Sequence, residues 1–144
     1  MPTYTDEEME QFLHKNVRSQ GFNGWLKPDP HAYKKGEIEF TLKVREEMTQ
    51  HHGYVHGGIL ATLADNACAW VGASATGMDV VTSSINIHYM APARGTVLRV
   101  KGRAIRAGKR IATTHADVYI EAEGKSPVHC AHAVASIAIL EPRE

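Results

Sequence analysis

The sequence predicts an α+β fold in which an antiparallel sheet wraps around one long central helix. Two observations carry this prediction: residues 56–77 form the one long helical run, and four strand-like stretches follow it with only short turns between them. Strands joined by short turns are antiparallel, and an apolar helix laid on such a sheet gives a layered domain. The 144 residues, 43% of them hydrophobic, suffice for a single domain with one core.

The first predicted element is an amphipathic helix over about residues 5–18, and Thr5 or Asp6 can cap its start. Its apolar residues recur at helical spacing. They are Met9, Phe12, Leu13 and Val17. Residues 20–35 are rich in glycine, proline and aromatic side chains, so we expect a loop there with at most one short strand around Trp25.

The core, about residues 36–140, begins with the clearest strand. From residue 36 to residue 44 apolar side chains alternate with polar ones, which is typical of a strand with one wet face. A polar loop then leads into the long helix at His56. The later strands are predicted at residues 80–90, 96–106, 110–121 and 128–140.

The long helix is apolar on nearly every side. Its sheet cannot cover all of this surface, so we expect a second subunit to cover the rest. We expect no membrane partner, because Thr62 and Asp65 interrupt the apolar run and it is shorter than a span requires.

Charge and cysteine content limit which classes of partner and which cellular compartment we expect. Sixteen basic residues balance sixteen acidic ones, which gives no reason to expect nucleic acid as a partner. Cys68 and Cys130 lack the spacing of a zinc or redox motif and are typical of buried free thiols in a reducing compartment. The acidic N-terminal segment is unlike a signal peptide, so we expect a cytoplasmic protein.

Asp65 is the residue most suited to chemistry. A carboxylate inside an apolar helix loses hydration, so it must be paired, protonated or used in a reaction. Gly57 and Gly58 follow His56 at the start of the same helix, where unpaired N–H groups can polarise a carbonyl oxygen. From these residues alone, a structural carboxylate and a flexible helix entry stay open as alternatives.

Residues 56–66, HGGILATLADN, are preceded by Gln50 and followed by SSINIHYMAPARG. This pattern resembles the hotdog-fold acyl-CoA thioesterases of the phenylacetic-acid-degradation type, which belong with the 4-hydroxybenzoyl-CoA thioesterases. The resemblance extends over about residues 36–140, and an acid nine residues after the motif histidine is fairly specific within the superfamily. It implies a hotdog fold, hydrolysis of an acyl-CoA thioester, and a homodimer that pairs again into a homotetramer.

The resemblance also implies a composite active site. Gly57 and Gly58 would polarise the thioester carbonyl, and Asp65 of the other subunit would act as nucleophile or general base. Many relatives carry Glu at this helix position. Because Asp is one methylene shorter, direct attack and water activation both stay open.

Three further residues gain roles from the resemblance. Gln50 lies where relatives carry Asn or Gln near the thioester. His56 is the motif histidine, which supports the loop geometry or the thioester sulfur. Thr82 matches a Ser or Thr that helps to position water in some relatives.

The anionic part of coenzyme A requires cations, and two turns supply them. Arg94 lies in the first turn, MAPARG. The second turn contains Arg106, Gly108, Lys109 and Arg110. The resemblance places such a turn near the nucleotide and pantetheine, although basic turns are commonly just solvated edges. No separate cofactor is expected, since CoA is part of the substrate.

We expect no metal site. His51 and His52 lie near His56 in sequence, but no further ligands follow at a zinc-like spacing. The histidines on the predicted strands are more typical of hydrogen-bonded sheet residues. They are His88, His115, His129 and His132.

Two other functions stay open. A hotdog dehydratase or hydratase also polarises a thioester at a helix N-terminus, and a non-catalytic acyl-CoA-binding module would use the same fold. Asp65 argues against pure binding, which needs no carboxylate beside a thioester. The acyl group, aryl or medium-chain, is not predicted; Trp70 could limit its length, but we expect Trp70 to fill the core.

Overall fold

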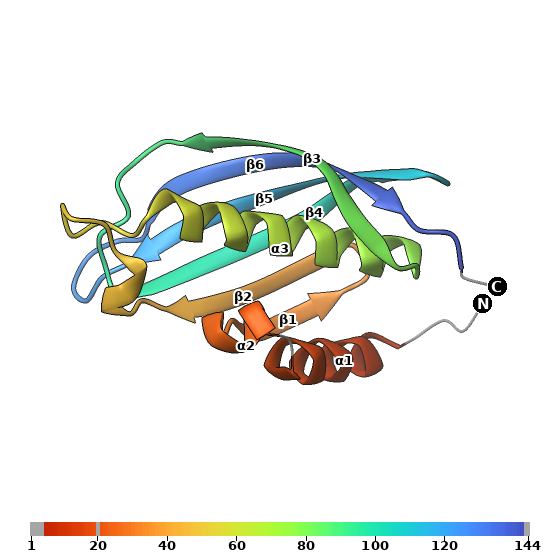
Figure 1. Ribbon diagram of the computed structural model, residues 1–144, viewed down its shortest axis with the longest axis horizontal. Helices are drawn as coiled ribbons and strands as arrows, with labels where there is room; N and C mark the ends of the chain where they lie inside the picture. Colours follow the sequence, from red (N-terminus) through yellow and green to blue (C-terminus); the bar gives the residue numbers. More distant parts are fainter. Residues whose placement is uncertain (1–4, 20, 143–144) are drawn as a thin grey trace.

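The computed structural model describes residues 5–19 and 21–142. Within these residues, helices and strands occur in separate runs, as expected for an α+β chain, and four consecutive strands follow the long helix (Figure 1). In chain order the elements are α1 (Asp6–Ser19), α2 (Gly21–Leu26), β1 (Asp29–Lys34), β2 (Glu37–Lys43), the short 3-10 helix η1 (Glu46–Met48), α3 (Gly57–Thr76), β3 (Val80–Tyr89), β4 (Val97–Ala107), β5 (Ile111–Glu121) and β6 (Val128–Ile139).

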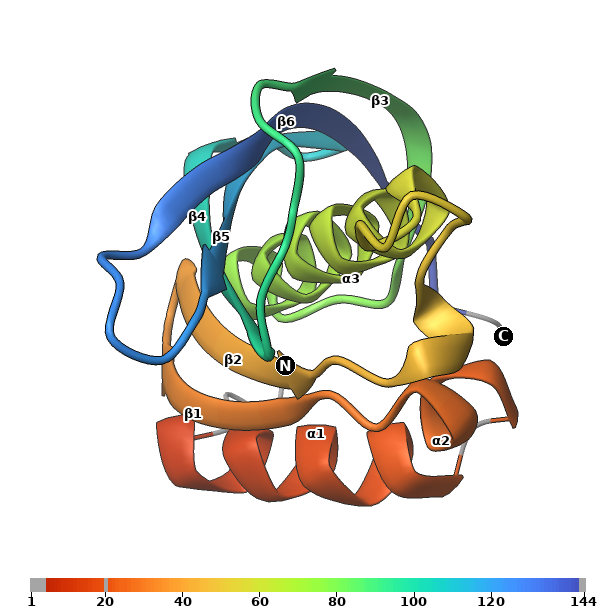
Figure 2. The ribbon, with the colours of Figure 1, turned by 90° about the vertical axis from the view of Figure 1, so that its left-hand side faces the viewer.

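The strands form one antiparallel sheet in the order β1-β2-β4-β5-β6-β3. The sheet curls around α3, which lies along its concave face (Figure 2). This arrangement is the hotdog fold, and it confirms the predicted fold class. Each strand predicted after residue 36 coincides with an observed strand.

Two glycines let α3 lie close to the sheet. A Cβ on Gly102 of β4 would lie 3.0 Å from side-chain carbons of Ile38 and Val71, and a Cβ on Gly72 of α3 would lie 2.9 Å from Ile137. Real Cβ contacts are rarely this short, so the helix can approach its sheet this closely only because both side chains are missing. The close approach accounts for the complete burial of Val71 and Ile137.

The ends of α3 lie where the sequence predicts them. His56 caps the N-terminus, and Gly77 ends the helix in the left-handed conformation, with φ of 69°. Trp70 packs edge-on against Phe40 with ring centroids 5.1 Å apart, and it contributes to the core as expected. No helix of the described chain is long and apolar enough to cross a membrane.

The N-terminal helix is confirmed, and its cap is reciprocal. The Glu8 N–H donates to Thr5 Oγ1 at 3.2 Å, while the Thr5 N–H donates to the Glu8 carboxylate at 2.8 Å. This is a capping box, which satisfies two N–H donors that the helix itself cannot satisfy. Of the two predicted caps, Thr5 is therefore the one in use.

The prediction for residues 20–35 was wrong. Trp25 belongs to the short helix α2, where its ring stacks on Phe22 and lies 4.9 Å from the Arg45 guanidinium. The strand of this region is β1, which begins at Asp29. Pro30 is acceptable there because β1 is at the edge of the sheet, where a missing N–H need not break a ladder.

Cys68 and Cys130 are free and completely buried, as expected. Burial raises the pKa of each thiol to about 11. Both side chains are therefore protonated and unreactive at neutral pH.

Candidate active site

His56 caps the N-terminus of α3 and engages one of the amide groups of its first turn. Its Nδ1 accepts a 2.8 Å hydrogen bond from the Gly58 N–H, and its carbonyl oxygen accepts one from the Ile59 N–H. The Gly57 N–H has no hydrogen-bond partner among the described residues. Of the two glycine amides predicted to polarise a carbonyl, Gly57 is available in this structure, whereas the Gly58 amide is already engaged by the cap.

Gly57 lines a pocket of about 360 Å³ at the start of α3. Gln50, which precedes the helix by one loop, lines the same pocket. The Gln50 Oε1 accepts a hydrogen bond from the His52 N–H, so the Gln50 amide group is left with its NH₂ as a donor. The structure therefore places two N–H donors, from Gly57 and Gln50, around one small cavity.

The predicted helix acid contacts the predicted strand hydroxyl. Thr82 Oγ1, on β3, donates a 2.6 Å hydrogen bond to Asp65 Oδ1, on α3. Asp65 and Thr82 are both partly buried. One carboxylate oxygen is thus held in place by Thr82, and the carboxylate faces the edge strand β3 rather than the middle of the sheet.

Gly57 and Asp65 of one chain cannot act on the same carbonyl group. They are eight residues apart on one helix, which corresponds to roughly 12 Å along the helix axis. Consistent with this distance, Asp65 is absent from the lining of the pocket beside Gly57. One chain therefore holds two separated halves of the predicted site.

Arg94 lies near the pocket at the start of α3. Its guanidinium group donates a hydrogen bond to the His52 carbonyl at 3.3 Å and lies 4.7 Å from the centre of the Tyr54 ring. Tyr54 itself lines the pocket with Gly57 and Gln50. The structure thus brings this predicted CoA-binding cation to the predicted active site.

The second basic turn lies at the other end of the molecule. It connects β4 to β5 near the C-terminal end of α3 (Figure 1), and its side chains are exposed. The eleven residues of β4 span roughly 35 Å. One chain therefore does not bring Arg94 together with the turn formed by Arg106, Gly108, Lys109 and Arg110.

Sequence reasoning missed Tyr54 and Tyr89, which both line the pocket. The Tyr89 hydroxyl donates to the Gly57 carbonyl at 3.2 Å, and the Tyr89 ring would lie 3.5 Å from a Cβ at Gly57. Tyr89 is the last residue of β3, which pairs with β6. This end of β3 lies beside the start of α3, where Tyr89 contacts Gly57. Only the sheet order reveals this contact, and no local sequence pattern does.

Comparisons with known proteins find thioesterases among the proteins similar to this chain. The family model described as the thioesterase superfamily matches residues 52–126. A human protein named acyl-coenzyme A thioesterase 13 is 35% identical over 97 residues, which cover 62% of this chain and 66% of that protein. The chain thus spans just under two thirds of the length of this relative.

Solved structures share the fold over nearly the whole chain. Zebra fish thioesterase superfamily member 2 superposes with a TM-score of 0.80 at 25% identity and covers 94% of this chain and 99% of its own. The Escherichia coli PaaI protein from the phenylacetic acid degradation operon superposes with a TM-score of 0.82. Its identity is 19%, over 96% of this chain and 97% of its own, so this second likeness concerns the fold alone.

Proposed function

This chain belongs to the thioesterase superfamily, and from that membership we propose that it hydrolyses acyl-CoA thioesters to a free acid and CoA. The observation that carries the proposal is the pocket beside Gly57, where an unengaged helix N-terminal amide lies next to the Gln50 side chain. The likeness to acyl-coenzyme A thioesterase 13 supports the same chemistry.

The first step of the proposed mechanism is polarisation of the thioester carbonyl. The Gly57 N–H donates to the carbonyl oxygen, and the Gln50 NH₂, from a residue that lines the same pocket, contributes a second hydrogen bond. Negative charge develops on this oxygen during hydrolysis, and one preorganised donor there contributes about 3 kcal/mol. His56 acts indirectly, because its contact with Gly58 fixes the first turn of α3.

The acid in each site comes from the partner subunit. The separation of roughly 12 Å along α3 keeps Asp65 away from the carbonyl bound at Gly57 of its own chain. β3 is an edge strand of the sheet, so two copies can pair β3 against β3 and form one continuous sheet. We propose this dimer, paired again into a tetramer, as the active form.

Two chemical routes fit the position of Asp65. As a general base, the carboxylate takes a proton from water, the water oxygen attacks the acyl carbon, and the bond to CoA sulfur breaks. As a nucleophile, Asp65 forms an acyl anhydride with release of CoA, and water then hydrolyses the anhydride. In both routes Thr82 holds one carboxylate oxygen and leaves the other free to react.

CoA recognition is proposed to begin at Arg94, which lies beside the pocket. The turn with Arg106, Gly108, Lys109 and Arg110 can reach a CoA only if the partner subunit brings it near, given its distance from Arg94. The acyl group is either aryl, as in phenylacetic acid degradation, or medium-chain. We expect the activity in a reducing compartment such as the cytoplasm, because both cysteines are free.

The test is thiol release from a panel of aryl and straight-chain acyl-CoAs by the wild-type protein and by Asp65→Asn. Loss of the carboxylate should lower kcat by orders of magnitude, with the oligomeric state and the melting temperature unchanged. Equal rates for the two proteins would remove Asp65 from the mechanism. No thiol release by the wild type from any substrate would refute the proposed activity.

The same panel separates the alternative functions. A dehydratase or hydratase would change the absorbance of an enoyl-CoA without releasing thiol. A binding module would bind acyl-CoA in calorimetry and turn over none of the panel. The carboxylate of Asp65, held by Thr82 and partly buried, favours hydrolysis over binding alone.

A further inference from the structure

A group of potential metal ligands lies on the convex face of the sheet, away from α3. His115 and Asp117 are two residues apart on β5, and His132 lies directly opposite Asp117 on β6. Residues two apart on a strand, and residues directly opposite on neighbouring strands, share one face of a sheet. One potential ligand atom from each of the three residues lies within 4.8 Å of the other two.

The contacts inside the group are close. His132 Nδ1 lies 2.7 Å from Asp117 Oδ1, and the His115 and His132 rings are 5.8 Å apart. All three side chains are half-buried. Two imidazoles and one carboxylate form a donor set that suits zinc and similar divalent transition metals.

A fourth side chain approaches the same carboxylate. His129 Nε2 lies 2.8 Å from Asp117 Oδ1. This nitrogen is buried, yet its orientation does not make a hydrogen bond with any described group. His129 thus adds a third imidazole beside the Asp117 carboxylate.

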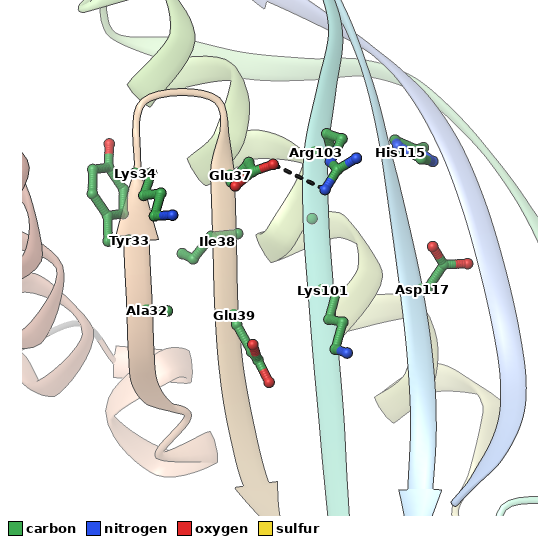
Figure 3. Close-up of a pocket in the computed structure, with 11 residues that line it drawn as sticks. Ala32, Tyr33, Lys34, Glu37, Ile38, Glu39, Lys101, Arg103, His115 and Asp117 are labelled. Carbon is green, nitrogen blue, oxygen red and sulfur yellow. Dashed lines mark ion pairs between the residues drawn. The ribbon is translucent and has the colours of Figure 1, made fainter.

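A cavity of about 450 Å³ adjoins the group. Its lining includes His115 and Asp117 at one side and residues of β1, β2 and β4 at the other (Figure 3). The neighbouring cations on this face have other partners: Arg103 forms a 2.9 Å ion pair with Glu37, and the Lys101 ammonium lies 5.6 Å from the centre of the Tyr119 ring. A metal ion here could thus keep water ligands on the cavity side.

We propose that His115, Asp117 and His132 bind a divalent transition-metal ion of the zinc type. The site is distinct from the pocket at Gly57, because it lies on the opposite face of the sheet from α3. A bound ion would join β5 to β6 in the middle of the sheet. This proposal departs from the expectation that the strand histidines make only hydrogen bonds, and it follows from a cross-strand register that sequence spacing does not show.

The experiment is metal titration of the full chain after treatment with a chelator. Calorimetry with zinc should give one ion per chain, and cobalt should give the visible absorption of a low-coordinate site with nitrogen and oxygen ligands. In Asp117→Asn and His132→Ala the zinc affinity should fall by more than about 100-fold, since even loss of a supporting partner weakens metal binding about 10–100-fold. Asp117→Asn nearly preserves the side-chain shape, so folding is expected to survive.

Two control variants address the other histidines. His31→Ala, on edge strand β1, and His51→Ala, in the loop before α3, should bind zinc as the wild type does. Zinc should also raise the melting temperature of the wild type and of both controls, but not that of Asp117→Asn. Absence of zinc binding by the wild type overturns the proposal, as does binding that survives Asp117→Asn and His132→Ala but is lost in His51→Ala.

Discussion

The Thr82 hydroxyl donates a 2.6 Å hydrogen bond to Asp65 Oδ1, and this contact joins the central helix to the edge strand of the sheet. It leaves the Asp65 carboxylate with one oxygen restrained and one oxygen available. The restraint holds the carboxylate toward β3, where we propose that the partner subunit binds.

The first prediction concerns Thr82→Val, which removes the hydroxyl and keeps the shape. We expect kcat for thioester hydrolysis to fall about tenfold with little change in KM, because the carboxylate is still present but less well oriented. Steady-state kinetics on the best substrate of the panel measures both constants. Ser84→Ala, an exposed serine on the same strand, should behave as the wild type; equal losses in the two variants would indicate a general effect on β3.

Gly57→Ala should lower activity without lowering the stability of the fold. Its Cβ would make ordinary contacts of 3.5 to 3.8 Å with the Tyr89 ring, and alanine favours a helix over glycine by about 0.5–1 kcal/mol. We expect an equal or higher melting temperature and a kcat/KM at least about tenfold lower, because the methyl group fills space beside the amide that binds the carbonyl. Gly21→Ala, at the open start of α2, is the matched control.

Mixed dimers test whether the active site is composite. Subunits carrying Asp65→Asn and subunits carrying Gly57→Val should each be nearly inactive alone. Refolded together in equal amounts, they should recover about a quarter of the wild-type rate, since half of the dimers are mixed and each of those has one intact site. A mixture that stays as inactive as its components would contradict the composite site.

His56→Ala should destabilise the protein. The variant loses the acceptor for the Gly58 N–H, and loss of a helix N-cap costs about 1 kcal/mol. We expect the melting temperature to fall by about 3 °C at a fixed protein concentration. His56→Asn supplies another good cap and should recover most of the loss; failure of this rescue would mean that His56 stabilises the loop by other contacts.

The buried thiols predict how stability depends on pH. Burial raises the pKa of Cys68 and Cys130 from 9.0 to about 11 in the folded protein. Well below pH 9 both thiols are protonated in the folded and unfolded states, so their contribution to the free energy of unfolding is complete there. Above pH 9 the unfolded state ionises first, and the free energy of unfolding should fall by on the order of 2 kcal/mol per thiol up to pH 11.

Urea unfolding at pH 8, 9 and 10 measures this dependence. Cys68→Ala should show a shallower decline above pH 9 than the wild type. A thiol reagent should label neither cysteine quickly in the folded protein at pH 8, and both after unfolding. Rapid labelling of the folded protein would contradict the burial of these thiols.

The long elements could be predicted from the sequence because each has a clear period. α3 and β2 are examples: a long apolar run follows His56, and strict alternation begins at Glu37. The region of α2 and β1 could not be predicted, since a six-residue helix with two glycines has no recognisable period and Pro30 argues against a strand. The edge position that makes Pro30 acceptable appears only in the sheet order.

The candidate site could be predicted as a set of residue types and only partly as a geometry. The motif predicts Asp65, Gly57 and Gln50 as site residues. It does not predict that the Gly58 N–H donates to His56 Nδ1, because this hydrogen bond depends on the rotamer of the His56 side chain. The two basic turns lie at opposite ends of β4, and their separation follows from the path of that strand across the sheet. The metal-ligand group depends on the register between β5 and β6, which no spacing within one strand specifies.

The sheet order also determines when the sheet can be completed during synthesis of the chain. β3 is made before β4 and β5, yet its ladder partner is β6, the last strand. While a ribosome synthesises the chain, α3 and β3 therefore stay without their full cover until residues 128–139 have emerged. A truncation before residue 128 would remove an interior strand rather than an edge strand. β3 would then lose its ladder partner, and Thr82 would hold the Asp65 carboxylate from a strand that is no longer part of the sheet.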